Sequence, residues 1–203
     1  MADLAQLTRA VDRLVPGSIV RLGGMTDCFQ PAEIVHRITY KTIRLLSERG
    51  IGYLIVTKSD MVAEERYLDV MDPRLAHIQI SVTATDDVLA RTYERAVPPS
   101  RRIAAVEKLQ RRGFDTALRL SPFIPQFVDT DRINSVKCAK VLVEFLRING
   151  HISRLFDIDL SGYVLSQGGY RHLSLEDKVG FLERITGFDS LSVCEDVTIH
   201  YAY

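Results

Sequence analysis

The sequence predicts an α/β protein whose sheet is mainly parallel. Short runs of β-branched and apolar residues alternate with segments of helical periodicity, an order typical of repeated strand–helix units with right-handed crossovers. The run 53–57 is apolar at nearly every position, as expected of a strand that is covered on both faces. In such sheets, ligands bind outside the carboxyl ends of the strands.

The elements follow one another at short intervals. The expected strands are 18–22, 53–57, 77–82, 116–120 and 141–146, with closing strand material at 191–193 and 197–201. The expected helices are 4–14, 31–50, 64–71, a brief one capped by Asp86, 99–113, one near 131–140 and 174–187. Between 147 and 173 the chain is rich in Gly, Tyr, Asp and Ser, which predicts a loop with an uncertain strand.

Glycine, proline and capping residues mark where these elements begin and end. Pro31 and Pro99 suit the first turn of a helix, and Gly50 and Gly113 suit its last turn. Ser174, with Asp177 three residues later, resembles a capping box that opens the last helix. The boundaries therefore have local chemical causes.

Composition narrows the class of protein. The 203 residues carry 26 Lys plus Arg and 26 Asp plus Glu, a balance that gives no overall attraction to nucleic acid or membrane. No stretch approaches the roughly 20 apolar residues of a membrane helix, and no secretory signal is predicted. The three cysteines, Cys28, Cys138 and Cys194, are far apart. An odd, scattered set fits the reducing cytoplasm and provides no close-spaced metal motif.

The first strand ends in a glycine pair followed by acceptor groups. Gly23 and Gly24 let a backbone approach a ligand closely, while Thr26 and Asp27 suit an amino group or a hydroxyl. The alternative is a glycine turn in which Asp27 caps the next helix, and this segment alone favours that alternative.

The second strand ends in a lysine. Lys58 could bind a carboxylate or a phosphate at this position. It could equally be a solvated lysine paired with Asp60. Both interpretations stay open.

The third and fourth strands carry polar residues within apolar surroundings. Gln79, Ser81 and Thr83 alternate with apolar residues, which places them on one face and favours a polar barrel interior. Arg119 lies between two leucines and needs an acidic partner or a ligand carboxylate. Glu144 on the next strand is the favoured partner.

A basic stretch and five histidines have simpler interpretations. The stretch 91–112 contains seven Lys and Arg residues, among them Arg101 and Arg102, and Glu94 and Glu107 lie between them. It could meet a phosphate backbone, but a solvated helix face is the commoner case. The histidines show no ligand spacing, so each is expected to be structural or exposed.

Taken together, these strand ends resemble radical S-adenosylmethionine enzymes. The similarity is closest to the spore photoproduct lyase family and its DNA-repair-photolyase-like relatives, and it covers about 18–147. The matching segments are 23–33 (GGMTDCFQPAE), 57–60 (TKSD), 79–83 with 86–87, 94–102 (ERAVPPSRR), 119–125 (RLSPFIP) and 145–147 (FLR). Their order and spacing together carry the resemblance.

The resemblance implies a partial (β/α)6 TIM-like barrel that binds S-adenosylmethionine at its strand ends. Gly23 and Gly24, with Thr26 beside them, would lie near the methionine amino group. Lys58, Ser81 and Arg119 would lie near the carboxylate and ribose. In the family a reduced 4Fe–4S cluster cleaves this cofactor to a 5′-deoxyadenosyl radical, and the resemblance implies lyase chemistry in DNA repair.

The sequence departs from the family at the cluster. The family motif Cys-x-x-x-Cys-x-x-Cys precedes the glycine-pair strand, and the residues before Ser18 contain no cysteine. We therefore expect a barrel without its first strand and no 4Fe–4S cluster in this chain, because a cluster needs several converging thiolates. Cys28 lies near the position of a hydrogen-donating cysteine in the family, at a different offset from Asp27. We also expect 1–150 to form the partial barrel and 151–203 an extension packed on it.

Three functions remain in view. The first is a radical S-adenosylmethionine core, lyase-like with nucleic acid as a substrate, and inactive as this isolated chain. The second is a cluster-free barrel that acts as a binding or interaction module. The third is a βα-barrel lyase or isomerase in which Lys58 forms a Schiff base or transfers a proton. Catalytic residues and oligomeric state are left open, and no membrane partner is expected.

Overall fold

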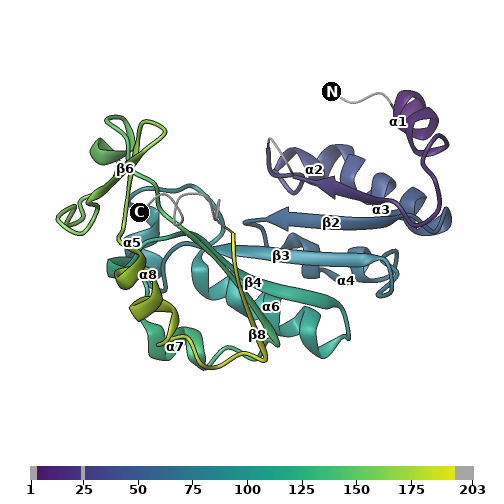
Figure 1. The fold of residues 1–203 in the computed structure, drawn as a ribbon. Coiled ribbons are helices and arrows are strands. Elements are labelled where there is room, and N and C mark those ends of the chain that lie inside the picture. Colours follow the sequence, from purple (N-terminus) through teal and green to yellow (C-terminus); the bar gives the residue numbers. More distant parts are fainter. Residues whose placement is uncertain (1–3, 24–25, 195–203) are drawn as a thin grey trace.

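The fold is an open, six-stranded parallel sheet that forms a partial barrel (Figure 1). The computed structural model describes residues 4–23 and 26–194. The strand order is β1-β2-β3-β4-β5-β8, and every neighbouring pair is parallel. The strands are β1 (Ile19–Leu22), β2 (Gly52–Thr57), β3 (Ala76–Val82), β4 (Asp115–Phe123), β5 (Lys140–Phe145) and β8 (Ser190–Val193). The α/β fold class and the partial barrel are confirmed.

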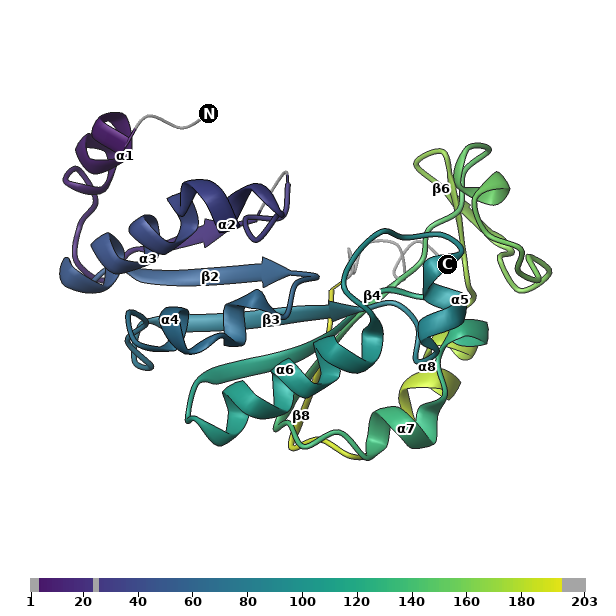
Figure 2. The same ribbon diagram turned by 180° about the vertical axis from the view of Figure 1, so that it is seen from behind.

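Helices cover the outer face of this sheet, and the apolar core lies between them. Figure 2 shows α3, α4 and α6 on the near side of the strands. Ile55, Ile80 and Leu118 point to this face and are fully buried, as expected where a parallel strand is covered by a helix. The helices are α1 (Leu4–Val11), α2 (Ala32–His36), α3 (Ile38–Glu48), α4 (Glu65–Leu68), α5 (Asp87–Arg91), α6 (Pro99–Arg111), α7 (Thr130–Asn134) and α8 (Leu175–Leu182).

The inner face of the sheet is concave and carries polar side chains. Parallel register aligns Leu54 with His77 and Asp115, and Ser81 with Arg119. Side chains aligned in this way point to the same face. Gln79 and Ser81 therefore lie on the inner face together, as their alternation with isoleucines predicts.

The helix expected from Pro31 to Gly50 is broken in two. Arg37 adopts φ 52 between α2 and α3, a left-handed conformation that interrupts the helical hydrogen bonds. Glu33 is buried, and its carboxylate accepts hydrogen bonds from the backbone N–H groups of Thr39 and Tyr40, each at 2.8 Å. The first turn of α3 is thus capped by a side chain from α2.

The helix expected near 131–140 is shorter and begins earlier. The Asp129 carboxylate accepts from the N–H groups of Asp131 and Arg132 and caps α7. The helix ends at Asn134, and Lys140 already belongs to β5. Short 3₁₀ turns also occur at Met61–Ala63, Pro125–Phe127 and Ile152–Arg154.

The region after residue 150 contributes to the same sheet. A hairpin of β6 (Leu165–Gln167) and β7 (Tyr170–His172) is followed by α8, which Ser174 caps as predicted. β8 then pairs with β5, so the sheet continues beyond the expected boundary at 150, and the division into 1–150 and 151–203 stays a prediction. The strand material expected at 197–201 lies outside the described residues. No helix in the described part of the chain combines the length and apolar character of a membrane span.

Candidate functional site

A pocket of about 240 Å³ lies at the carboxyl ends of β1, β2 and β3. Four of the six predicted site residues line it: Gly23, Thr26, Lys58 and Ser81. Asp27, Val56 and Thr57 complete its lining. Gly24 lies outside the described residues, and Arg119 does not line the pocket. The predicted strand ends therefore do converge on one concavity.

Gly23 brings the end of β1 against β2. It adopts φ 85, and a Cβ built at this position would lie 2.4 Å from the carbonyl oxygen of Val56. No side chain fits at that distance, and the left-handed conformation itself favours glycine. The predicted close backbone approach at Gly23 is thus made to the protein's own second strand.

Asp27 ties the loop after β1 to the end of β2. Its carboxylate accepts hydrogen bonds from Thr57 Oγ1 at 2.8 Å, from the Lys58 N–H at 2.7 Å and from the Phe29 N–H at 2.9 Å. The interpretation of Asp27 as the cap of the next helix is therefore wrong: Pro31 is the N-cap of α2, and the Asp27 bond to Phe29 lies in the loop before it. The carboxylate shapes the pocket wall and is already well supplied with donors.

Lys58 pairs with Glu94, a partner that the sequence did not predict. Its Nζ lies 2.6 Å from Glu94 Oε2, whereas Asp60 pairs with Arg101. The pairing of Lys58 with Asp60 was thus wrong. The Lys58 side chain is about one-third exposed and lines the pocket, and its ammonium pairs with the largely buried Glu94.

Glu94 also binds Arg102, whose side chain is fully buried. Arg102 donates to the backbone carbonyls of Val97 and of Ser81, the latter at 2.9 Å. Burial acts to raise the pKa of Glu94, but hydrogen bonds from Arg102 and Lys58 outweigh it and hold that pKa below its usual value. One ionised carboxylate therefore links the pocket lysine to the arginine beneath β3.

The interpretation of 91–112 as a solvated helix face is wrong for Arg102. This residue shares its face of α6 with Val106 and Leu109, both fully buried. The spacing of 102, 106 and 109 is helical, and this periodicity could have identified Arg102 as an inward-facing residue. The sequence offered no comparable periodicity for Glu94: Arg102 lies eight residues later, but Lys58 lies 36 residues earlier in the chain.

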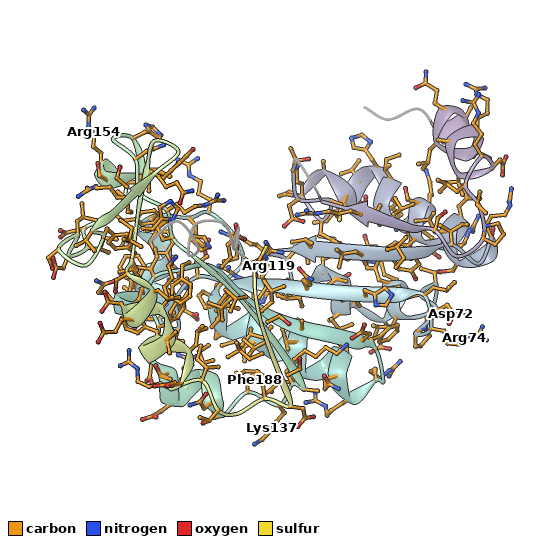
Figure 3. All side chains as sticks on the ribbon, in the orientation of Figure 1. Asp72, Arg74, Arg119, Lys137, Arg154 and Phe188 are labelled. Carbon is orange, nitrogen blue, oxygen red and sulfur yellow. The ribbon has the colours of Figure 1, made fainter. Side chains whose placement is uncertain are left out.

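Arg119 has protein partners, as the favoured interpretation expects. It donates to Glu144 Oε2 at 2.6 Å and to Gln79 Oε1 at 2.8 Å, and Figure 3 shows it near the centre of the view. Ser121 also donates to Glu144, at 2.8 Å. Burial acts to raise the pKa of Glu144, yet the Ser121 and Arg119 hydrogen bonds keep it lowered. Arg119 is the register partner of Ser81 and so borders the pocket without lining it.

The cysteines do not fit an iron–sulfur cluster. Cys28 follows β1, Cys138 precedes β5 at the opposite end of the strands, and Cys194 follows β8. Burial and the charge of Asp27 raise the pKa of Cys28 to about 12, which disfavours the thiolate that a cluster needs. Within the described ranges, no group of three or more His, Cys, Asp or Glu side chains is placed to hold a metal ion.

Comparison with known proteins finds similarity only at the level of structure. No protein-family model matches the sequence, and no curated protein matches it. The structure is similar to spore photoproduct lyase complexed with dinucleoside spore photoproduct, with a TM-score of 0.64 and 13% identity over 93% of this chain. A double mutant of that enzyme with bound AdoMet and dinucleoside spore photoproduct gives 0.61 at 13% identity and the same coverage. In both cases the chain spans 64% of the enzyme's length.

A second enzyme has a similar fold. A domain of pyruvate-formate lyase-activating enzyme from Bacteroides vulgatus gives a TM-score of 0.58 at 12% identity, over 88% of this chain and all of that domain. The structural likeness agrees with the family that the sequence motifs resemble. At these identities it shows a shared partial-barrel fold.

Proposed function

We propose that this partial barrel binds S-adenosylmethionine and acts as a binding module. The observation that carries the proposal is the pocket at the strand ends, where Gly23, Thr26, Lys58 and Ser81 meet. These four residues lie at the ends of three neighbouring strands, and the sequence motifs predict all four as site residues. Likeness to a spore photoproduct lyase structure with bound AdoMet supports the same ligand class.

The donor set fits the amino-acid end of the ligand. The Lys58 ammonium provides a charge for a carboxylate, and the hydroxyls of Thr26 and Ser81 can bond an amino group or a carboxylate oxygen. The pocket, at about 240 Å³, is smaller than the roughly 300–1,000 Å³ of sites that enclose a whole drug-sized ligand. It suits the methionine portion and leaves the adenosine outside.

A catalytic alternative is a radical S-adenosylmethionine lyase acting on nucleic acid. It is favoured by the likeness to an enzyme structure that holds dinucleoside spore photoproduct. It would require cluster thiolates, and Cys28 follows β1, Cys138 precedes β5 and Cys194 follows β8.

The Schiff-base alternative is disfavoured by the surroundings of Lys58. A nucleophilic lysine must lose its proton, usually in an apolar pocket or beside another cation. Lys58 is instead held at 2.6 Å by the Glu94 carboxylate. An ammonium in such an ion pair suits electrostatic binding of an anion.

Calorimetric titration of the chain with S-adenosylmethionine tests the proposal. We expect saturable 1:1 binding that Lys58→Met weakens by about tenfold, the value of one charge-assisted hydrogen bond. Lys41→Met, which removes a lysine whose Nζ donates to the His36 carbonyl at the surface, is the matched control and should leave affinity unchanged. Absence of binding in a chain with an intact circular dichroism spectrum would overturn the proposal.

Anaerobic reconstitution with iron and sulfide separates the binding module from the enzyme. We expect substoichiometric iron that a desalting column removes. Retention of about four irons per chain with a thiolate charge-transfer spectrum would reject the cluster-free assignment and favour the lyase. Binding of S-adenosylmethionine without a retained cluster supports the module.

A further inference from the structure

A second, larger pocket of about 320 Å³ lies on the same concave face, at the opposite ends of the strands. These are the blunt ends of the arrows in Figure 1. The pocket shares no lining residue with the one at the carboxyl ends. Gln79 lines this lower pocket, Ser81 lines the upper one, and the hydrogen bond from Arg119 to Gln79 lies between them. The two pockets are therefore separate sites.

Three charged or titratable side chains form a chain of hydrogen bonds on its wall. His77 Nδ1 lies 2.6 Å from Asp115 Oδ2, and Lys140 Nζ donates to Asp115 Oδ1 at 2.6 Å. They come from β3, β4 and β5, and all three line the pocket. Burial acts to raise the pKa of Asp115, but its bonds to Lys140 and His77 keep that pKa lowered. Asp115 is thus an ionised centre between two donors.

The free hydrogen-bonding groups around Asp115 favour an anion. The carboxylate already has a partner on each oxygen, so a cation would have to displace Lys140. The Lys140 ammonium uses one of its three donors here. His77 Nε2 has no hydrogen bond within the described part of the chain, and Ser190 and Ser192 line the pocket from β8.

The rest of the wall is apolar. Leu54, Ala117 and Leu142 point to the inner face in register with these polar groups, and Ile19 closes the β1 side. A mostly apolar pocket with a few converging polar groups is typical of small-molecule sites, and its volume is at the small end of that range. The arrangement fits an amphipathic ligand with one charged end.

We propose that this lower pocket binds a small organic monocarboxylate, with its carboxylate at Lys140 and His77 and its apolar body against Leu54 and Leu142. This site is distinct from the proposed S-adenosylmethionine site, and neither proposal depends on the other. In the complex, Lys140 bridges the ligand and Asp115, while a doubly protonated His77 donates from Nδ1 to Asp115 and from Nε2 to the ligand carboxylate.

Three probes with six carbons each test the proposal: hexanoate, hexylammonium and 1-hexanol. In two-dimensional NMR of the labelled protein, hexanoate should shift the signals of His77, Lys140 and Leu142. The affinity for hexanoate obtained from these shifts should be at least tenfold higher than that for either other probe. Equal binding of hexanoate and 1-hexanol, or preference for hexylammonium, would overturn the proposal. So would the absence of any shift with hexanoate.

Two substitutions should act in opposite directions. Lys140→Met removes the ligand's main charge partner and leaves Asp115 to repel a carboxylate, so hexanoate affinity should fall at least tenfold. Asp115→Asn removes that repulsion and should strengthen hexanoate binding several-fold, even though it weakens a bond within the protein. Lys41→Met is the control and should have no effect. Equal affinity in the Lys140 and Asp115 variants would contradict the proposal, and the Asp115 variant keeps the test available if the Lys140 variant does not fold.

Discussion

Lys58 Nζ lies 2.6 Å from Glu94 Oε2, and the other oxygen of the same carboxylate binds the buried Arg102. Glu94 therefore serves the pocket and the core at once. Lys58 lines the pocket at the end of β2, while Arg102 donates a hydrogen bond to the backbone carbonyl of Ser81. Changing this one carboxylate should affect both stability and the position of the pocket lysine.

Glu94→Gln should destabilise the fold strongly. Arg102 has no exposed surface, so the substitution leaves a buried guanidinium without its counter-charge, at a cost of about 3 kcal/mol. Urea denaturation measures the free energy of unfolding. Glu65→Gln is the control, because Glu65 also pairs with two cations, Lys108 and Arg112, but is exposed, and it should change stability only slightly. Equal losses in the two variants would contradict the assignment.

The same carboxylate should contribute to acid denaturation. The pKa of Glu94 is lowered in the folded protein, so its ionised form contributes stability that is complete above the pKa of an unfolded glutamate. That contribution declines as the pH falls below this value and is lost once the pH passes the folded pKa. Stability curves against pH should therefore fall less steeply in acid for Glu94→Gln than for the wild type.

Gly23→Ala should damage the pocket far more than Gly113→Ala. Both glycines have positive φ, 85 and 79, so each alanine has a similar conformational cost of roughly 1 kcal/mol. Only at Gly23 does the added Cβ meet backbone, at 2.4 Å from the Val56 oxygen, whereas nothing lies within 4 Å at Gly113. We expect Gly23→Ala to lose S-adenosylmethionine binding and Gly113→Ala to retain it in titration calorimetry. Retained binding in both variants would show that the close approach is dispensable.

The three cysteines should differ in reactivity. A pKa of about 12 leaves Cys28 with a thiolate fraction on the order of 10⁻⁴ at about pH 8, and burial also raises the pKa of Cys138. Cys194 is exposed. Brief iodoacetamide treatment of the native protein, followed by peptide mass spectrometry, should label Cys194 first. Labelling of all three at one rate is expected only after unfolding.

Local signals in the sequence determined the α/β class, most element positions and where a ligand site should lie. Alternating polar residues in β3 placed Gln79 and Ser81 on the inner face, and the run of glycines and polar residues after the strands marked Gly23, Thr26 and Lys58. These signals work because periodicity and turn chemistry depend on neighbours in the chain. The capping of α8 by Ser174 was predicted for the same reason.

Only the tertiary structure decided which side chains pair. The break at Arg37 depends on the hydrogen bond that Glu33 makes to the first turn of α3. Lys58 pairs with Glu94 and not with Asp60, which is nearer in sequence, because the end of β2 and the loop before α6 lie close together in space. Charge pairing depends on distance and burial, which sequence separation does not encode. The sequence therefore predicted where the pocket at the strand ends lies. The charge pairs of that pocket, and the whole lower pocket around Asp115, depend on how strands distant in the sequence pack together.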